Sequence, residues 1–183
     1  MKLTFLPVLL LLSTGCSQMS ESVMDDKTGL NGGFETVVNS LPVNWLVYTE
    51  KTIGNGDFDI LPDSEDVREG KKSLRFTVRE CSAQGGRFSP GVAREMDAVA
   101  GSVYRLSIQV KNEGTLYRIS AGGVTGETGE VKLLIETSET NSTWTILTFD
   151  VPVSADYSRL RFEISILSPG TLRVDDLQVM KVE

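Results

Sequence analysis

Three segments of the chain alternate apolar and polar residues with a period of two. Leu74, Phe76 and Val78 are separated by single polar residues, and the segments 104–111 and 159–166 repeat this scheme. Successive side chains of a strand point to opposite faces of a sheet, so these segments are predicted to be strands with one buried and one solvated face. Such strands are typical of an antiparallel sheet.

Further short segments of the same character lie between glycine, proline and asparagine residues. Strands are predicted near 44–50, 57–61, 91–96, 116–124, 131–136, 143–151 and 171–181. No stretch of helical length keeps a helical period between capping residues. Many short strands without helices predict an all-β fold, a two-sheet antiparallel β-sandwich of the jelly-roll class.

Two of the predicted strands change phase partway along. In 143–151 the apolar set shifts by one residue after Ile146, and in 171–179 it shifts at Asp175 and Asp176. Each shift predicts a β-bulge, which re-aims side chains. The second bulge is expected to turn one carboxylate inward and to leave the other near solvent. The inward carboxylate needs a partner, because an unpaired buried charge is costly.

The first 16 residues resemble a bacterial export and lipidation signal. Lys2 precedes an apolar stretch over 3–12, about ten residues, which is too short to cross a bilayer, since that needs roughly twenty. Small residues then lead to Cys16. The pattern predicts a signal peptide over 1–16 that ends at a lipidated Cys16. The alternative is an ordinary cleaved signal in which this cysteine is incidental.

Residues 17–29 are polar and lack periodicity, so they are predicted to form a flexible tether before one domain over 30–183. No later apolar run approaches membrane length, so membrane contact is expected only through the lipid anchor. Ser17 follows the cysteine, which by the sorting pattern of enteric bacteria favours the outer membrane, on its periplasmic or surface face.

The charge and the missing residue types limit the possible functions. Eighteen basic and 25 acidic residues give a net charge of −7, which becomes −8 when Lys2 leaves with the signal. This balance argues against a nucleic-acid partner. The chain has no histidine, so Ser-His-Asp, Cys-His and histidine-metal sites are excluded. With Cys16 lipidated, Cys81 is expected to pack as a small apolar group.

Several segments, taken in order, resemble a known family. They are Leu-Asn-Gly-Gly-Phe-Glu at 30–35, Leu-Pro-Val-Asn-Trp at 41–45, Val-Arg-Glu-Gly-Lys-Lys-Ser-Leu at 67–74, the strand at 104–111, the stretch 144–149 and Leu-Arg-Val-Asp-Asp-Leu at 172–177. The set is similar to carbohydrate-binding modules of the family four, nine and twenty-two type, which have a galactose-binding-like jelly roll. The resemblance covers nearly all of 30–181 and implies glycan binding without catalysis.

The resemblance also implies a structural calcium near the chain termini. Its ligands would be Glu35, the main chain near Lys71, and Asp175. Calcium takes several oxygen ligands and mixes carboxylates with carbonyls, which fits this set. The alternative is that Glu35 pairs with a cation such as Lys71 or Arg173.

Sugar recognition uses an aromatic face together with a few polar groups. The positions of Trp45, Trp144 and Tyr104 predict core packing. The tyrosines at 48, 117 and 157 and the phenylalanine at 88 lie in segments with weaker alternation and are candidates for exposure. The predicted ligand site is a cleft lined by Arg87, Phe88, Tyr117 and Arg118. Ordinary loop and surface roles for these residues are the alternative.

These observations predict a non-catalytic exported lipoprotein that binds glycan or polysaccharide. The alternative is a structural or interaction lipoprotein, in which the same fold docks other cell-envelope proteins and binds no sugar. The acid-rich stretch 57–69 lacks the Glu-x-Asp-x-x-Glu strand spacing of jelly-roll glucanases, so it favours solvated loops over a glycosidase site.

Overall fold

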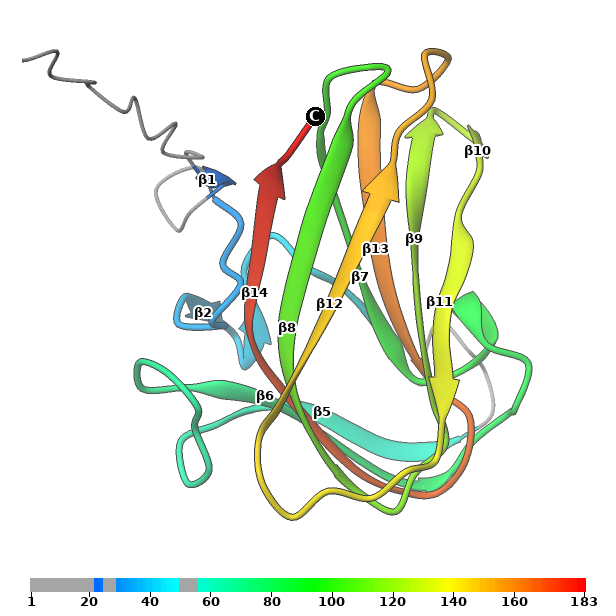
Figure 1. Cartoon of the computed structure of the whole chain (residues 1–183). Coiled ribbons are helices and arrows are strands. Elements are labelled where there is room, and N and C mark those ends of the chain that lie inside the picture. Colours follow the sequence, from blue (N-terminus) through cyan, green and yellow to red (C-terminus); the bar gives the residue numbers. More distant parts are fainter. Residues whose placement is uncertain (1–21, 25–28, 50–55) are drawn as a thin grey trace, which may run out of the picture.

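The computed structural model describes residues 22–24, 29–49 and 56–183. Apart from one 3-10 helix, η1 (Gly86–Phe88), its regular elements are strands that pair antiparallel, most of them in two facing sheets (Figure 1). Within these residues, no helix has the length and the apolar character needed to cross a membrane. The predicted all-β sandwich is confirmed.

Sheet 1 has six strands, with the last strand of the chain in its middle. β14 pairs with β8 along most of its length, with β6 over its first half and with β1 near its end. The spatial order is β12 (Thr145–Pro152), β8 (Val103–Glu113), β14 (Gly170–Lys181), β6 (Ser73–Glu80) and β5 (Asp57–Asp63), with β1 (Ser22–Met24) as an additional partner of β14. The predicted tether over 17–29 therefore includes β1, in which Ser22 and Met24 pair with the domain, and its other residues, except Gly29, lie outside the described ones.

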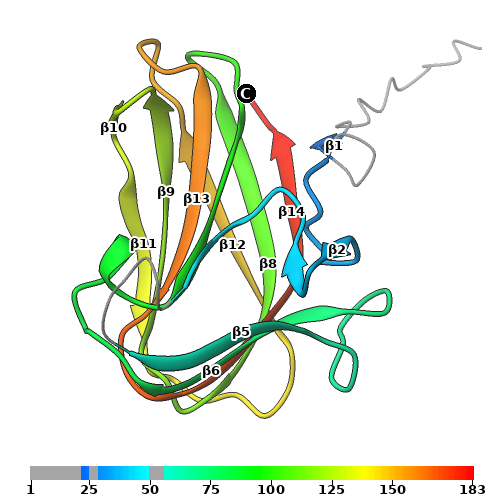
Figure 2. The ribbon, with the colours of Figure 1, turned by 180° about the vertical axis from the view of Figure 1, so that it is seen from behind.

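Sheet 2 also has six strands, of which β9, β13 and β7 run side by side in Figure 2. Its spatial order is β10 (Thr128–Gly129), β9 (Tyr117–Thr125), β13 (Arg159–Ile166), β7 (Gly91–Asp97) and β4 (Leu46–Tyr48), with β11 (Lys132–Thr137) also paired to β9. A separate hairpin is formed by β2 (Val37–Val38) and β3 (Leu41–Pro42). All ten strands expected from the sequence are present.

The apolar faces of the two sheets meet in one core. Phe76, Leu106 and Leu172 from sheet 1 and Ile119 and Phe162 from sheet 2 have no exposed surface. Each of these residues belongs to the apolar half of its alternating strand. The polar half therefore faces outward on both sheets, and the outer faces are where binding chemistry can lie.

The opening segment of the domain closes one side of this core. The ring of Trp45 lies 5.0 Å from the ring of Phe34, and its indole N–H donates a hydrogen bond of 3.0 Å to the carbonyl of Asn31. A Cβ atom on Gly32 would lie 2.0 Å from the carbonyl oxygen of Leu177, so only glycine allows this approach to β14. The predicted core role of Trp45 is confirmed.

Tyr104 is also confirmed as a core residue, since it is 1% exposed. Its hydroxyl accepts a hydrogen bond of 2.8 Å from the backbone N–H of Val99. Cys81 is half-buried and packs against the core, as expected, and burial raises the pKa of its thiol.

One of the two predicted bulges is present. The pairing of β14 with β8 shifts between Asp175 and Gln178, and Asp176 has a φ of 50°. Asp175 is fully buried, whereas Asp176 keeps contact with solvent. The bulge therefore divides the two carboxylates as the sequence predicted.

The bulge predicted within 143–151 is absent, because β12 pairs with β8 in unbroken register from Thr145 to Pro152. Ile146 lies on the outer side of this edge strand and is 58% exposed, so it does not belong to the inward set. Trp144 precedes the strand and is half-buried on the surface. The predictions of a bulge here and of a core role for Trp144 are wrong.

Candidate functional site

Sheet pairing aligns the outward residues of sheet 2 in transverse rows. One row runs from Leu46 through Ala93, Glu163 and Ser120 to Leu133. The strands are about 4.8 Å apart, so this row spans about 19 Å. Leu46 and Leu133 at its two ends are 56% and 57% exposed. The row thus has an apolar residue at each end and Glu163 at its centre, where Ala93 and Ser120 are small neighbours.

Arg161 links the polar groups of this face. It stands opposite Glu95 in the sheet, and its Nη1 lies 3.3 Å from Glu95 Oε1. Its Nη2 lies 3.2 Å from Glu163 Oε2 and donates a hydrogen bond of 2.9 Å to the hydroxyl of Tyr48. Arg159 adds a contact of 2.8 Å to the second oxygen of Glu95. The network holds two carboxylates and two guanidinium groups in fixed positions on the outer face of sheet 2.

Tyr48 lies under this network and is only 4% exposed. Its burial, together with the nearby charge of Glu163, raises the pKa of its hydroxyl above the ordinary value for tyrosine. The group therefore stays neutral at physiological pH and remains a hydrogen-bonding hydroxyl. This burial contradicts the expected exposure of Tyr48.

A hollow of about 280 Å³ opens beside the network. It is lined by Asn44, Leu46, Ala93, Arg94, Glu95, Arg159 and Arg161. Concave sites with apolar walls and a few convergent polar groups are the usual form of small-ligand sites.

The loop over 82–89 rises at one end of this face and presents Phe88, which is 50% exposed. Gly85 and Gly86 both have positive φ values. The N–H of Gly85 donates to Ser89 Oγ at 2.8 Å, and the N–H of Gly86 donates to Ser165 Oγ at 3.0 Å. Since the side chain of Ser165 lies on the outer face of β13, the loop is fastened directly to the face.

Three of the four predicted site residues gather at this end. The guanidinium carbon of Arg87 lies 5.2 Å from the centre of the Phe88 ring. Arg118 points outward from β9 and donates to Glu136 Oε2 at 2.8 Å. A Cβ atom on Gly85 would lie 2.7 Å from Arg118 Nη1, so this arginine also touches the 82–89 loop.

Tyr117 does not join them, because its ring is 4% exposed and belongs to the core. It is the neighbour of Arg118 in the same strand, so the two side chains point to opposite faces. Burial raises the pKa of its hydroxyl, and Glu139 adds to the shift. The prediction that Tyr117 lines the cleft is wrong.

Sequence reasoning missed the residues of the network. Arg161 and Glu163 were recognised only as the polar half of a strand, and Glu95 was not singled out. Their closeness depends on the register of β13 with β7, which joins residues 66 positions apart. No local pattern carries that information.

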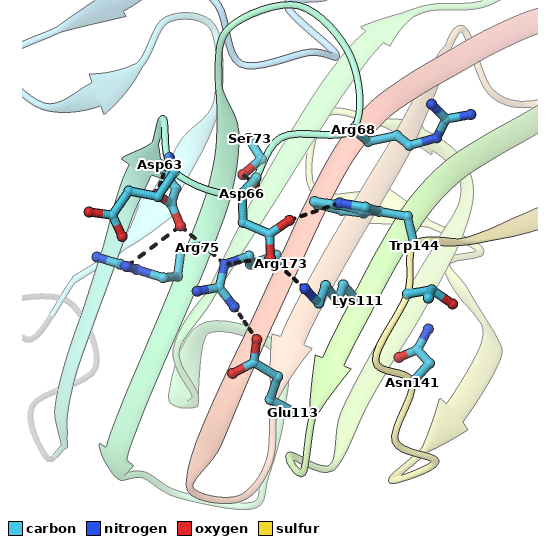
Figure 3. Close-up of polar contacts among 12 residues, drawn as sticks. Asp63, Asp66, Arg68, Ser73, Arg75, Lys111, Glu113, Asn141, Trp144 and Arg173 are labelled. Carbon is cyan, nitrogen blue, oxygen red and sulfur yellow. Dashed lines mark hydrogen bonds and ion pairs between the residues drawn. The ribbon is translucent and has the colours of Figure 1, made fainter.

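A second polar cluster lies on the outer face of sheet 1 (Figure 3). Asp66 Oδ2 lies 2.5 Å from Lys111 Nζ, and the indole N–H of Trp144 donates to Asp66 Oδ1 at 3.1 Å. Arg173 lies 3.1 Å from Asp63 and also pairs with Glu113. The hydrogen bond from Lys111 is the main reason that the pKa of Asp66 lies below its ordinary value. These groups bind one another and hold the loop over 64–72 on the sheet.

Asp175 and Glu35 both bind the backbone of this 64–72 loop. Asp175 Oδ2 accepts hydrogen bonds from the N–H groups of Arg68 at 2.9 Å and Glu69 at 3.0 Å. Glu35 Oε1 accepts from the N–H of Lys71 at 2.7 Å. Burial raises the pKa of Asp175, and these N–H groups oppose that shift. The partner of the inward carboxylate is thus the main chain.

The expected calcium ligands were Glu35, Lys71 through its main chain, and Asp175. A Cβ atom on Gly33 would lie 3.7 Å from Glu35 Cγ and 3.9 Å from Asp175 Oδ1, so both side chains border the same space. Across the described ranges no group of three His, Cys, Asp or Glu side chains gathers. Calcium accepts carboxylates together with carbonyls and water, so the two carboxylates suit it and its binding stays a prediction.

No family model matches the sequence, and no curated protein matches it. Solved structures do match. A family 22 xylan-binding domain from Paenibacillus barcinonensis has a TM-score of 0.60 at 16% identity, over 83% of this chain and 92% of that one.

A family 61 module, solved in complex with β-1,4-galactotriose, has a TM-score of 0.59 at 18% identity, over 83% of this chain and 96% of that one. A family 4 carbohydrate-binding module has a TM-score of 0.57 at 14% identity, over 82% and 97%. The chain therefore has the jelly-roll fold of these modules, and the resemblance seen in the sequence is confirmed at the level of the fold.

Proposed function

We propose that this protein is a non-catalytic glycan-binding protein whose ligand lies across the outer face of sheet 2. The observation that carries the proposal is the exposed Phe88, held at the end of a face on which Arg161, Glu95 and Glu163 form one polar network. A pyranose offers an apolar ring face and a rim of hydroxyls. An aromatic ring binds the first, and planar charged groups in fixed positions bind the second.

The length of the face favours a chain of sugars over a single one. The row from Leu46 to Leu133 spans about 19 Å, and between its ends Glu163 is flanked by the small residues Ala93 and Ser120. Two structural neighbours are described as a xylan-binding domain and as a complex with β-1,4-galactotriose. Both ligands are linear β-linked glycans, and this is the class that we propose here.

The state of the carboxylates supports a binding role without catalysis. Glycoside hydrolysis needs a pair of carboxyl groups, one of which stays protonated because its pKa is raised. Asp175 has a pKa raised by burial, but it is fully buried and binds the backbone of the 64–72 loop, so it cannot reach a ligand on sheet 2. Glu95 and Glu163 are instead held by arginines.

Export and lipidation at Cys16 are part of the proposal, and that cysteine lies outside the described residues. The signal-like sequence over 1–16 supports them, and the residue after the cysteine favours the outer membrane. In Figures 1 and 2, β1 lies on the side of the molecule opposite to η1. An anchor that precedes β1 would therefore leave Phe88 on the side away from the membrane.

Affinity gel electrophoresis of the full chain in detergent tests the binding role. We expect β-1,4-xylan or β-1,4-galactan to retard the wild type, and Phe88→Ala to weaken this by about two- to tenfold, since a stacked aromatic contributes roughly 0.5–1.5 kcal/mol. Ile146→Ala is the matched control, because Ile146 is similarly exposed on sheet 1. Absence of retardation by any polysaccharide, with and without calcium, would instead favour the protein-docking role.

A further inference from the structure

Arg87 differs from the other arginines at this site. Arg118, Arg159 and Arg161 each direct their N–H groups to a glutamate at 2.6–3.3 Å. Arg87 is exposed, and within the part of the chain that the structure describes it has no hydrogen bond or ion pair. A fourth arginine, Arg94, lines the hollow and donates to the main-chain carbonyls of Asn44 at 2.7 Å and Gly29 at 2.9 Å. The other arginines of the face are thus held by glutamates or by main-chain carbonyls, and Arg87, among the described residues, presents exposed, unpaired N–H groups at its end.

The position of Arg87 is set by its neighbour. Its guanidinium carbon lies 5.2 Å from the centre of the Phe88 ring, in a cation–π contact. Such a contact is weak at an exposed site. A sugar that stacks on this ring competes with the guanidinium, and a displaced guanidinium then needs a new partner.

We propose that Arg87 gives the site a preference for glycans that carry a carboxylate, that is, for chains with uronic acid substituents. The inference rests on the proposed function. A neutral sugar that takes the ring leaves Arg87 without a partner, whereas a uronate adjoining the stacked sugar offers two oxygens to the planar N–H fork. The exchange favours the acidic ligand.

The charge of the whole chain limits this preference. At −7 the protein repels dense polyanions through its long-range field. A single carboxylate beside Arg87 gains the local contact and meets little of that repulsion. The site should therefore prefer a sparsely substituted chain to both an unsubstituted chain and a polyuronide.

Isothermal titration of the full chain in detergent tests the preference. The probes are a β-1,4-xylo-oligosaccharide, the same backbone with one glucuronate branch, and an oligogalacturonate. We expect the singly branched probe to bind about fivefold more tightly than the unbranched one at low salt, with the advantage reduced at high salt. Arg87→Gln should remove this advantage, so that the branched and unbranched probes bind the variant with equal affinity. Arg87→Lys should keep part of it.

Arg68→Gln is the matched control, because Arg68 is an exposed arginine on the 64–72 loop and its loss changes the net charge equally. Equal affinities for the branched and unbranched probes, or equal losses in Arg87→Gln and Arg68→Gln, would overturn the preference while glycan binding stands. If neither xylan-derived probe binds and no other neutral or uronate-bearing glycan does, both the inference and the proposed function fall.

Discussion

Replacement of Asp175 by alanine tests how the bulge in β14 supports the domain. The carboxylate is fully buried, and it accepts hydrogen bonds at 2.9 Å and 3.0 Å from the N–H groups of Arg68 and Glu69. A third bond, of 2.7 Å, comes from the N–H of Asp176. Removal of the side chain leaves these donors without an acceptor and opens a small cavity beside them.

The expected cost follows from these contacts. A buried donor that loses its partner costs about 1–3 kcal/mol. Arg68 and Glu69 are exposed residues, so water can reach part of the loop and the lower end of that range applies to each donor. Relief of the buried charge offsets part of the loss, since burial raises the pKa of Asp175. We expect Asp175→Ala to lower the free energy of unfolding by about 2 kcal/mol.

Urea unfolding of the full chain in detergent, followed by tryptophan fluorescence, measures this change. Asp97→Ala is the control, because the side chain of Asp97 is 99% exposed and its loss should change the free energy by less than about 0.5 kcal/mol. Equal stabilities of the two variants would refute the account of the bulge. Repeating the experiment with calcium tests the predicted ion, which should stabilise the wild type and not Asp175→Ala.

The pH dependence has a definite sign for this residue. The folded pKa of Asp175 is raised above its unfolded value, so the folded state binds the proton of this group more tightly. This contributes stability that is fully present below the unfolded pKa and is lost as the pH rises through the folded pKa. The stability difference between the wild type and Asp175→Ala should therefore grow as the pH falls from neutral toward the ordinary range of aspartate. A difference that shrinks over this range would contradict the assigned shift.

Two further substitutions test contacts that position the opening segment and the 64–72 loop. Gly32→Ala places a Cβ atom 2.0 Å from the carbonyl oxygen of Leu177, so we expect thermal unfolding at a clearly lower temperature, and an unchanged midpoint would contradict the close approach. Asp66→Asn removes the ion pair with Lys111 but keeps an acceptor for the indole of Trp144, and it should cost about 1 kcal/mol near neutral pH. Because the folded pKa of Asp66 is lowered, this cost should disappear as the pH falls through that value, and a cost that persists in acid would count against the ion pair.

The strands could be predicted because each carries its own signal. A period of two is a local property, and in 73–79, 104–111 and 159–166 it marks both the strand and its buried face. The bulge at Asp175 could also be predicted. Leu172 and Val174 are out of phase with Leu177 and Val179, and a bulge between the two pairs lets both pairs face the core. The same reasoning wrongly predicted a bulge next to Ile146, because an edge strand tolerates an exposed apolar residue on its outer side.

The candidate site was only partly predictable, for two different reasons. Tyr117 and Arg118 are adjacent in a strand, so their side chains point to opposite faces and cannot both line one cleft. The error at Tyr117 could therefore have been avoided from the sequence alone. Arg161 and Glu95 meet through the register of strands that are distant in the chain, which no local pattern reports. Phe88 was found because a glycine-rich loop without alternation is where an aromatic ring can remain exposed.

The outer faces of the two sheets carry similar charged side chains that have different partners, and this contrast supports the proposed binding face. On sheet 1, Lys111 and Arg173 bind acids from the 64–72 loop or its start, so the loop already occupies that face. On sheet 2, the glutamates and arginines come from the strands themselves, and small residues such as Ala93 leave the space above them open. A glycan can replace solvent on the second face without displacing any of the residues that the structure describes, and for this reason we propose binding on sheet 2.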